Sequence, residues 1–126
     1  MTAAAPFGAI GQISRQVRDI PRAVDWFRDV LGLTHLFTFG DLAFFDCAGT
    51  RLYLNKAKDG AALGDSVLYF RAADIQAEYE RLRAKGVVFI GAPHMIHKHA
   101  DGTEEWMVFF EDPDGQTLAL MSQVMR

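Results

Sequence analysis

The chain carries one helix-forming signature twice, and this repetition constrains its fold more than any other feature. Residues 19–32 begin with Asp-Ile and end with glycine, and residues 74–86 repeat this pattern 55 positions later. In each copy the aspartate can cap a helix, apolar residues follow at helical spacing, and the glycine suits a left-handed stop. We therefore expect two helices at equivalent places in two similar modules.

A second repetition lies further along each module. Phe44-Phe45-Asp46 in the first module is similar to Phe109-Phe110-Glu111 in the second. Leu52-Tyr53-Leu54 is similar in the same way to Leu118-Ala119-Leu120. These segments have the composition and alternation of strands, and Gly, Pro and Asp mark the turns between them. The elements expected are strands at 10–17, 34–39, 42–47, 51–55, 66–72, 87–97, 104–111 and 116–123, and helices at 19–31 and 74–85.

Each module therefore has the order β-α-β-β-β, and the fold class is α+β. We expect module one at about residues 9–56, a linker at 57–64 and module two at about 65–124, all within one domain. Two such modules would form a curled mixed sheet around a concave trough, with the helices on the outer face. Strand alternation places six residues on the trough side of the two first strands: Gln12, Ser14, Gln16, Val67, Tyr69 and Arg71. Arg15 breaks the apolar pattern on the helix side.

Composition excludes several function classes. The chain has 126 residues and a net charge of −3, so it carries no basic footprint for nucleic acid. No apolar run approaches the roughly 20 residues of a membrane helix, and the first residues lack the pattern of a signal peptide. Cys47 is the only cysteine, so no intrachain disulfide can form, and we expect a structural thiol in a cytoplasmic protein.

The paired βαβββ order, the segment 19–33 and the Phe-Phe-Glu-Asp-Pro-Asp-Gly run at 109–115 resemble the vicinal oxygen chelate superfamily. That superfamily includes glyoxalase I, extradiol dioxygenases and bleomycin-resistance proteins, and the resemblance covers about residues 9–122. It implies a divalent metal in the trough, with ligands from the first and last strands of each module. The first-strand ligand is typically His or Gln before an apolar residue, and the last-strand ligand is Glu between two apolar residues.

In this chain the four positions hold Gln12, Tyr53, Val67 and Ala119. Only Gln12 could ligate, through a neutral amide oxygen, because a phenol with a pKa of about 10 is a poor substitute for a carboxylate. A catalytic metal usually keeps about three protein ligands. The sequence therefore predicts no metal at these positions and no cofactor, with a displaced divalent metal as the alternative.

The histidines offer the one place for such a displaced metal. His94, His97 and His99 lie near Glu104 and Glu105 across a turn, and His97 and His99 could share an ion. The interpretation we favour is a solvated hairpin end, since the segment also carries Lys, Asp and Gly. A histidine here could also contact a ligand or act as a general base without any metal.

Three functions follow from the resemblance and the residues. The favoured one is a metal-free protein that binds an apolar or aromatic small molecule, as in the bleomycin-resistance branch. The expected pocket residues are Gln12, Ser14, Tyr53, Tyr69, Trp106 and His97. The alternative is a lyase, isomerase or dioxygenase that uses a displaced metal or metal-free acid–base chemistry, and a third is a subunit whose trough serves assembly. We expect a homodimer, with the modules paired within one chain or swapped between two.

Overall fold

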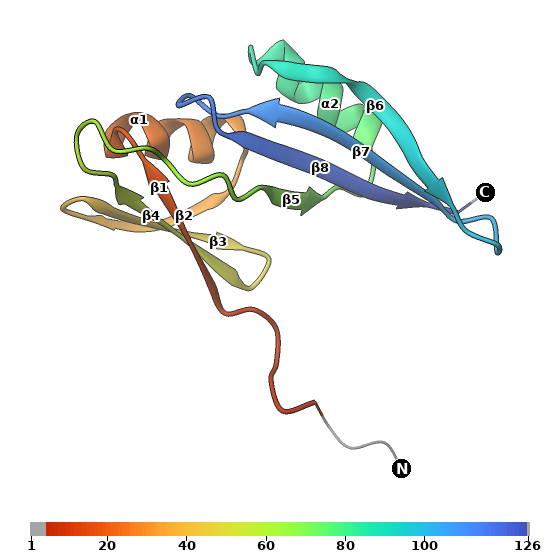
Figure 1. Ribbon diagram of the computed structural model, residues 1–126, viewed down its shortest axis with the longest axis horizontal. Coiled ribbons are helices and arrows are strands. Elements are labelled where there is room, and N and C mark those ends of the chain that lie inside the picture. Colours follow the sequence, from red (N-terminus) through yellow and green to blue (C-terminus); the bar gives the residue numbers. More distant parts are fainter. Residues whose placement is uncertain (1–4, 126) are drawn as a thin grey trace. The chain divides into compact units, whose positions relative to one another are not determined.

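The computed structural model describes residues 5–125, which divide into two compact units with the boundary between Gly64 and Asp65 (Figure 1). The expected linker at 57–64 lies at the end of the first unit. Each unit contains one helical segment and one four-stranded mixed sheet. No helix among residues 5–125 is long and apolar enough to cross a bilayer.

The first unit follows the order β-α-β-β-β. Strand β1 (Gln12–Val17) leads to α1 (Ile20–Asp25), which continues into the π-helical turn η1 (Trp26–Val30). Three strands follow, β2 (Thr34–Phe39), β3 (Leu42–Cys47) and β4 (Thr50–Lys56). The strands lie in the order β1-β4-β3-β2, with β1 parallel to β4 and the other pairs antiparallel.

The second unit repeats this topology. Strand β5 (Leu68–Arg71) leads to α2 (Ile75–Ala84), and β6 (Phe89–Lys98), β7 (Glu104–Glu111) and β8 (Thr117–Val124) follow. The strands lie in the order β5-β8-β7-β6, with β5 parallel to β8. The predicted tandem βαβββ modules are thus confirmed, although the first strand of the second unit is shorter than the expected 66–72 and excludes Val67.

Both helical segments begin and end as the sequence predicts. The side chains of Asp19 and Asp74 each accept a hydrogen bond from the backbone N–H three residues on, at 2.8 and 3.0 Å. Gly32 and Gly86 have positive φ angles of 82° and 86°, a backbone conformation that residues with a side chain rarely adopt. The first copy of the signature is one residue longer, and η1 accommodates this residue because a π turn is wider than an α turn.

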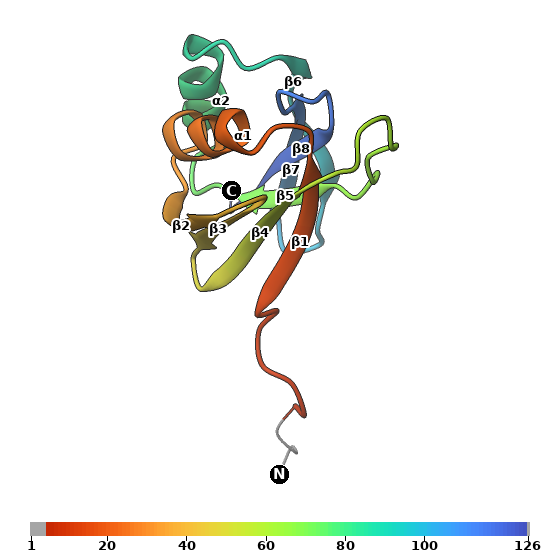
Figure 2. The same cartoon turned by 90° about the vertical axis from the view of Figure 1, so that its left-hand side faces the viewer.

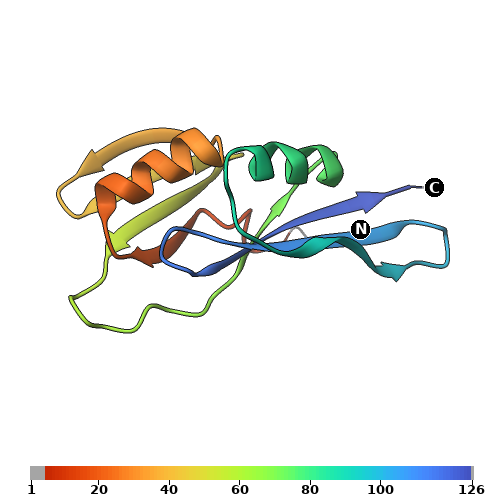
Figure 3. The ribbon, with the colours of Figure 1, turned by 90° about the horizontal axis from the view of Figure 1, so that it is seen from above.

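Each helical segment packs on one face of its own sheet and closes a separate core (Figures 2 and 3). In the first unit the rings of Phe27 and Phe45 are fully buried, with centroids 5.9 Å apart. In the second unit Phe110 is fully buried beside Phe89, at 5.4 Å. Arg15 lies on the helix-facing side of β1 as expected and is only 6% exposed.

The Glu-Asp-Pro-Asp-Gly run forms a tight turn between β7 and β8. Asp112 is 6% exposed, and its Oδ1 accepts hydrogen bonds from the backbone N–H groups of Asp114 and Gln116, both at 2.9 Å. Gly115 has a φ of 79° and donates its N–H to the Asp112 carbonyl at 2.9 Å. The second acidic residue of this run is therefore a structural residue that fixes the turn.

Candidate functional site

The face of the first sheet that points away from α1 carries a row of aromatic side chains. Register pairs Phe37 of β2 with Phe44 of β3, and Phe44 with Tyr53 of β4. The rings are stacked, with centroids 4.5 Å apart for Phe37–Phe44 and 5.0 Å for Phe44–Tyr53. We call these three residues the aromatic row; it crosses three adjacent strands and lies on the sheet face opposite the buried core.

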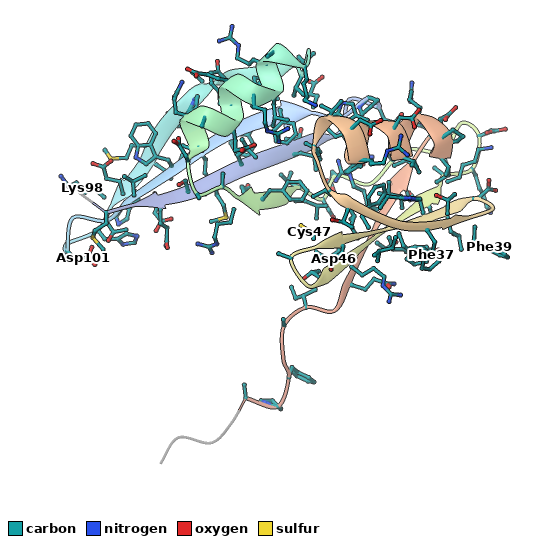
Figure 4. All side chains as sticks on the ribbon, turned by 180° about the vertical axis from the view of Figure 1, so that it is seen from behind. Phe37, Phe39, Asp46, Cys47, Lys98 and Asp101 are labelled. Atoms are coloured by element: carbon teal, nitrogen blue, oxygen red, sulfur yellow. The ribbon has the colours of Figure 1, made fainter. Side chains whose placement is uncertain are left out.

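This face is also exposed to an unusual degree for aromatic side chains. Phe37 is 48% exposed, and Phe39, which follows it on the same side of β2, is 75% exposed. Both extend from β2 away from the helix in Figure 4. Large apolar surfaces that remain open to solvent often mark a binding site.

Polar groups continue the row onto β1. Ser14 is the register partner of Tyr53, and its Oγ accepts a hydrogen bond from Asn55 Nδ2 at 2.9 Å. Gln12 and Gln16 lie on the same side of β1 and are exposed. Three of the predicted pocket residues, Gln12, Ser14 and Tyr53, are thus brought together on one sheet face.

A cationic side chain, that of Arg51, lies beside the aromatic row. The guanidinium carbon of Arg51 is 5.6 Å from the centroid of the Phe44 ring, within the range of a cation–π contact. Arg51 is exposed, pairs with Gln12 on one side and is opposite Asp46 on the other. Asp46 Oδ1 in turn accepts the N–H of Gly49 at 3.2 Å.

The corresponding face of the second sheet is built differently. Tyr69 is the register partner of Ala119, which pairs with Phe109, and the Tyr69 and Phe109 rings meet edge to face at 5.9 Å. Tyr69 is 46% exposed, whereas Ala119 is buried. Ser14 corresponds to Tyr69 on the first strand of each unit, and Tyr53 corresponds to Ala119 on the last strand. The phenol therefore lies on the last strand of the first unit and on the first strand of the second unit.

The histidines lie at the far end of this second sheet. Glu105 Oε2 accepts hydrogen bonds from His99 Nε2 and Gln123 Nε2, both at 2.8 Å, and the His97 and His99 rings are 4.7 Å apart. The hydrogen bond from His99, followed by that from Gln123, holds the pKa of Glu105 below its ordinary value. Within residues 5–125 no three His, Cys, Asp or Glu side chains are placed to hold a metal ion, so the pair His97 and His99 lacks a third ligand.

The predicted facing of Trp106 is wrong. Trp106 is the register partner of Ser122 and lies on the helix-facing side of β7, three residues from Phe109 and therefore on the opposite face from Tyr69. Its Nε1 donates to Glu104 Oε1 at 2.9 Å. With Ile75 and Ser122 it lines a cavity of about 380 Å³ at the start of α2. A one-residue error in strand phase moves a side chain to the other face.

The four family ligand positions do not form a set of metal donors. Gln12 is exposed on β1, Tyr53 belongs to the aromatic row, Val67 precedes β5, and Ala119 is buried on β8 as the register partner of Tyr69. An amide, a phenol and two hydrocarbon side chains lack the charge and the number of ligands that a catalytic divalent ion requires. The chemistry of these positions therefore does not fit the metal of the family.

Cys47 ends β3 and is half-buried. Burial raises the pKa of its thiol, and the nearby carboxylate of Asp46 raises it further. A thiol is a nucleophile only as the thiolate, so this environment favours the structural interpretation.

Sequence reasoning did not identify Phe37, Phe44, Arg51 or Asn55 as site residues. The alternation of Phe37 with Phe39 and of Arg51 with Tyr53 was a usable signal, because it places each pair on one side of a strand. The cross-strand register was not available from the sequence, since a β-bulge between His35 and Phe37 shifts the pairing of β2 with β3.

The fold and these faces define a class of proteins built from two βαβββ units. Residues 9–120 match the family model of the Glyoxalase/Bleomycin resistance protein/Dioxygenase superfamily, and the chain belongs to this superfamily. This confirms the resemblance found in the sequence. The uncharacterized protein YraH of Bacillus subtilis (strain 168) is 27% identical, and the match covers 82% of this chain and 89% of that protein.

Solved structures with the same fold include two from bacteria. A virulence protein from Salmonella typhimurium superposes with a TM-score of 0.76 at 18% identity, covering 95% of this chain and 100% of that one. The lactoylglutathione lyase from Agrobacterium tumefaciens gives a TM-score of 0.73 at 24% identity, covering 94% and 96% of the two chains. At these identities the similarity concerns the fold alone.

Proposed function

We propose that this protein binds a small aromatic compound without a metal ion, and that the ligand lies on the aromatic row of the first sheet. The observation that carries this proposal is the stacking of Phe37, Phe44 and Tyr53 on an open sheet face. A planar ligand placed on these rings would extend the stack and remove apolar surface from water, which is the main source of affinity in such sites.

Polar groups around the row would orient the ligand. The Ser14 hydroxyl is already held by Asn55, so its position is fixed before a ligand arrives. The Tyr53 phenol and the Gln12 amide supply one donor–acceptor group and one amide group on the same face. Tyr69 and His97 remain predicted ligand contacts of the second sheet.

Binding is favoured over the family's metal-dependent catalysis because the donor chemistry at the four ligand positions does not fit an ion. The His99–Glu105 pair could in principle move a proton, but Glu105 has a lowered pKa and is therefore a weak base near neutral pH. These two features together make a lyase, isomerase or dioxygenase the less supported function.

Titration with 2-naphthol, a neutral planar compound at pH 7, tests the proposal. We expect saturable binding that is unchanged by EDTA, and a roughly fivefold or greater loss of affinity in Phe44→Leu because one ring of the stack is removed. The matched control is Phe109→Leu, which changes the equivalent residue of the second sheet and should alter the affinity less than twofold. Binding that disappears with EDTA, or that depends equally on both residues, would contradict the proposal.

We further propose that the protein is a cytoplasmic homodimer. Strands β2 and β6 each lie at one edge of their sheet, and both expose large apolar side chains, among them Phe39 and Ile96. Unpaired strand edges with apolar side chains are commonly covered by a partner. Sedimentation velocity at micromolar concentration should give the mass of a dimer, and a monomer would contradict this expectation.

A further inference from the structure

The charge next to the aromatic row identifies the kind of aromatic compound that fits it. Arg51 and Tyr53 project from the same side of β4, two residues apart, which corresponds to about 7 Å along a strand. The guanidinium carbon lies 5.6 Å from the centroid of the Phe44 ring, which is the middle ring of the row. Phe44 is stacked on both sides, so a ligand can extend the stack only at an end ring such as Tyr53. A charged group on a ligand stacked on Tyr53 would therefore reach Arg51 without a long spacer.

The guanidinium of Arg51 has donors available. None of the ion pairs within 4 Å among the described residues involves Arg51. Asp46, its register partner, directs Oδ1 to the backbone N–H of Gly49 at the turn. Gln12, the register partner on the other side, adds an amide that can donate to the same anion.

We propose that the ligand of this face is an aromatic carboxylate whose acid group is attached to the ring directly or through one carbon. The ring lies on the aromatic row, and the carboxylate accepts two hydrogen bonds from Arg51, whose planar fork matches a carboxylate in geometry. This inference rests on the proposed function, because it assigns the chemical class of the ligand to the same sheet face.

The test compares 2-naphthoate with 2-naphthamide, which have the same ring and shape but differ in charge. We expect the wild-type protein to bind the acid about tenfold more tightly than the amide, as a charge-assisted hydrogen bond at a partly exposed site would give. In Arg51→Gln the two affinities should become equal, and Arg51→Lys should restore part of the preference. High salt should reduce the preference for the acid, because it screens the exposed charge.

Arg83→Gln is the matched control. Arg83 lies over the Tyr79 ring at 5.2 Å on α2, so this variant removes the same charge and the same type of contact from another surface. It should leave both affinities unchanged. Equal binding of acid and amide by the wild type, or an equal loss in both arginine variants, would overturn the assignment of the ligand class while leaving aromatic binding intact. Binding of neither compound would overturn the proposed function as well.

Discussion

The two sheets are alike on the side that faces a helix and unlike on the side that does not. Phe45 and Phe110 occupy the same repeated position and are both fully buried. On the open side, the first sheet carries stacked rings beside one arginine, whereas the second ends in the hydrogen-bonded pair of His99 and Glu105. Folding constrains the helix-facing sides of both sheets in the same way, because both must form a core. It leaves the open sides free to carry different residues.

The different strand positions of Tyr53 and Tyr69 are an example of this difference between the open sides. In the first unit a small residue on the first strand, Ser14, pairs with Tyr53 on the last strand; in the second unit Tyr69 on the first strand pairs with Ala119 on the last. Each unit keeps one phenol and one small residue in this cross-strand pair. The two pairs are alike in combining a large and a small side chain, whereas the strand that carries the phenol differs.

The largest expected effect is a loss of stability when a buried ring is removed from the helix-facing side of either sheet. Phe45→Ala and Phe110→Ala should each lower the free energy of unfolding by about 3–5 kcal/mol, because both remove a fully buried ring. Urea unfolding followed by circular dichroism measures this loss. Phe44→Ala, on the open face next to Phe45, should cost clearly less. Similar costs for Phe44 and Phe45 would contradict the assignment of an open face.

Removing either helix cap should cause a smaller loss of stability, and the loss should be equal in the two units. Asp19→Ala and Asp74→Ala should each destabilise the protein by about 1 kcal/mol, since each removes the acceptor for one backbone N–H. Asp19→Asn and Asp74→Asn are the controls, and they should recover most of the stability. Strongly unequal costs of the two alanine variants would show that the repeated signature is not equivalent in the two units.

The exchanged phenols should differ in ligand binding. Tyr53→Phe should weaken 2-naphthoate binding by about 1 kcal/mol or less, because it removes one hydroxyl from the ligand face and keeps the stacked ring. Tyr69→Phe should have a smaller effect. Equilibrium titration of both variants measures the difference, and a larger loss in Tyr69→Phe would move the ligand away from the first sheet.

The smallest effect is the titration of Glu105. Its lowered pKa means that its contribution to stability is present above the ordinary Glu value of about 4.3 and is lost as the pH falls through the lowered pKa. A side-chain NMR titration should show this low pKa. His99→Ala should raise it toward the ordinary value more than Gln123→Ala does, because the hydrogen bond from His99 is the larger cause. The reverse order would contradict the geometry of this pair.

Local signals made the frame of each unit predictable. Asp19 and Asp74 act as helix caps, and Gly32 and Gly86 as left-handed stops, because each of these residues satisfies a need of the backbone close to it in the chain. The order of the helix and strands along each module then followed from the repetition. The extra residue in the first helix was visible in the sequence, because Gly32 lies one residue further from Asp19 than Gly86 lies from Asp74.

The site was less predictable because it depends on which strands become neighbours. Alternation placed Gln12 and Ser14 on one face, and the resemblance to the family added Tyr53, at the last-strand ligand position; the structure has all three on this face. The phase of β7 had no comparable marker, and Trp106 was assigned to the wrong face. The bulge in β2 sets which phenylalanine stacks on Phe44, and no property of the β2 sequence alone fixes that pairing.

The environment of Cys47 has a practical consequence for chemical labelling. The raised pKa of the Cys47 thiol gives it a smaller thiolate fraction than an ordinary cysteine, so it reacts more slowly with maleimides and with mild oxidants. An exposed cysteine introduced elsewhere would therefore be modified faster than Cys47. Phe39→Cys would place a fluorophore at the edge of the aromatic row, where it could report directly on occupancy by a ligand.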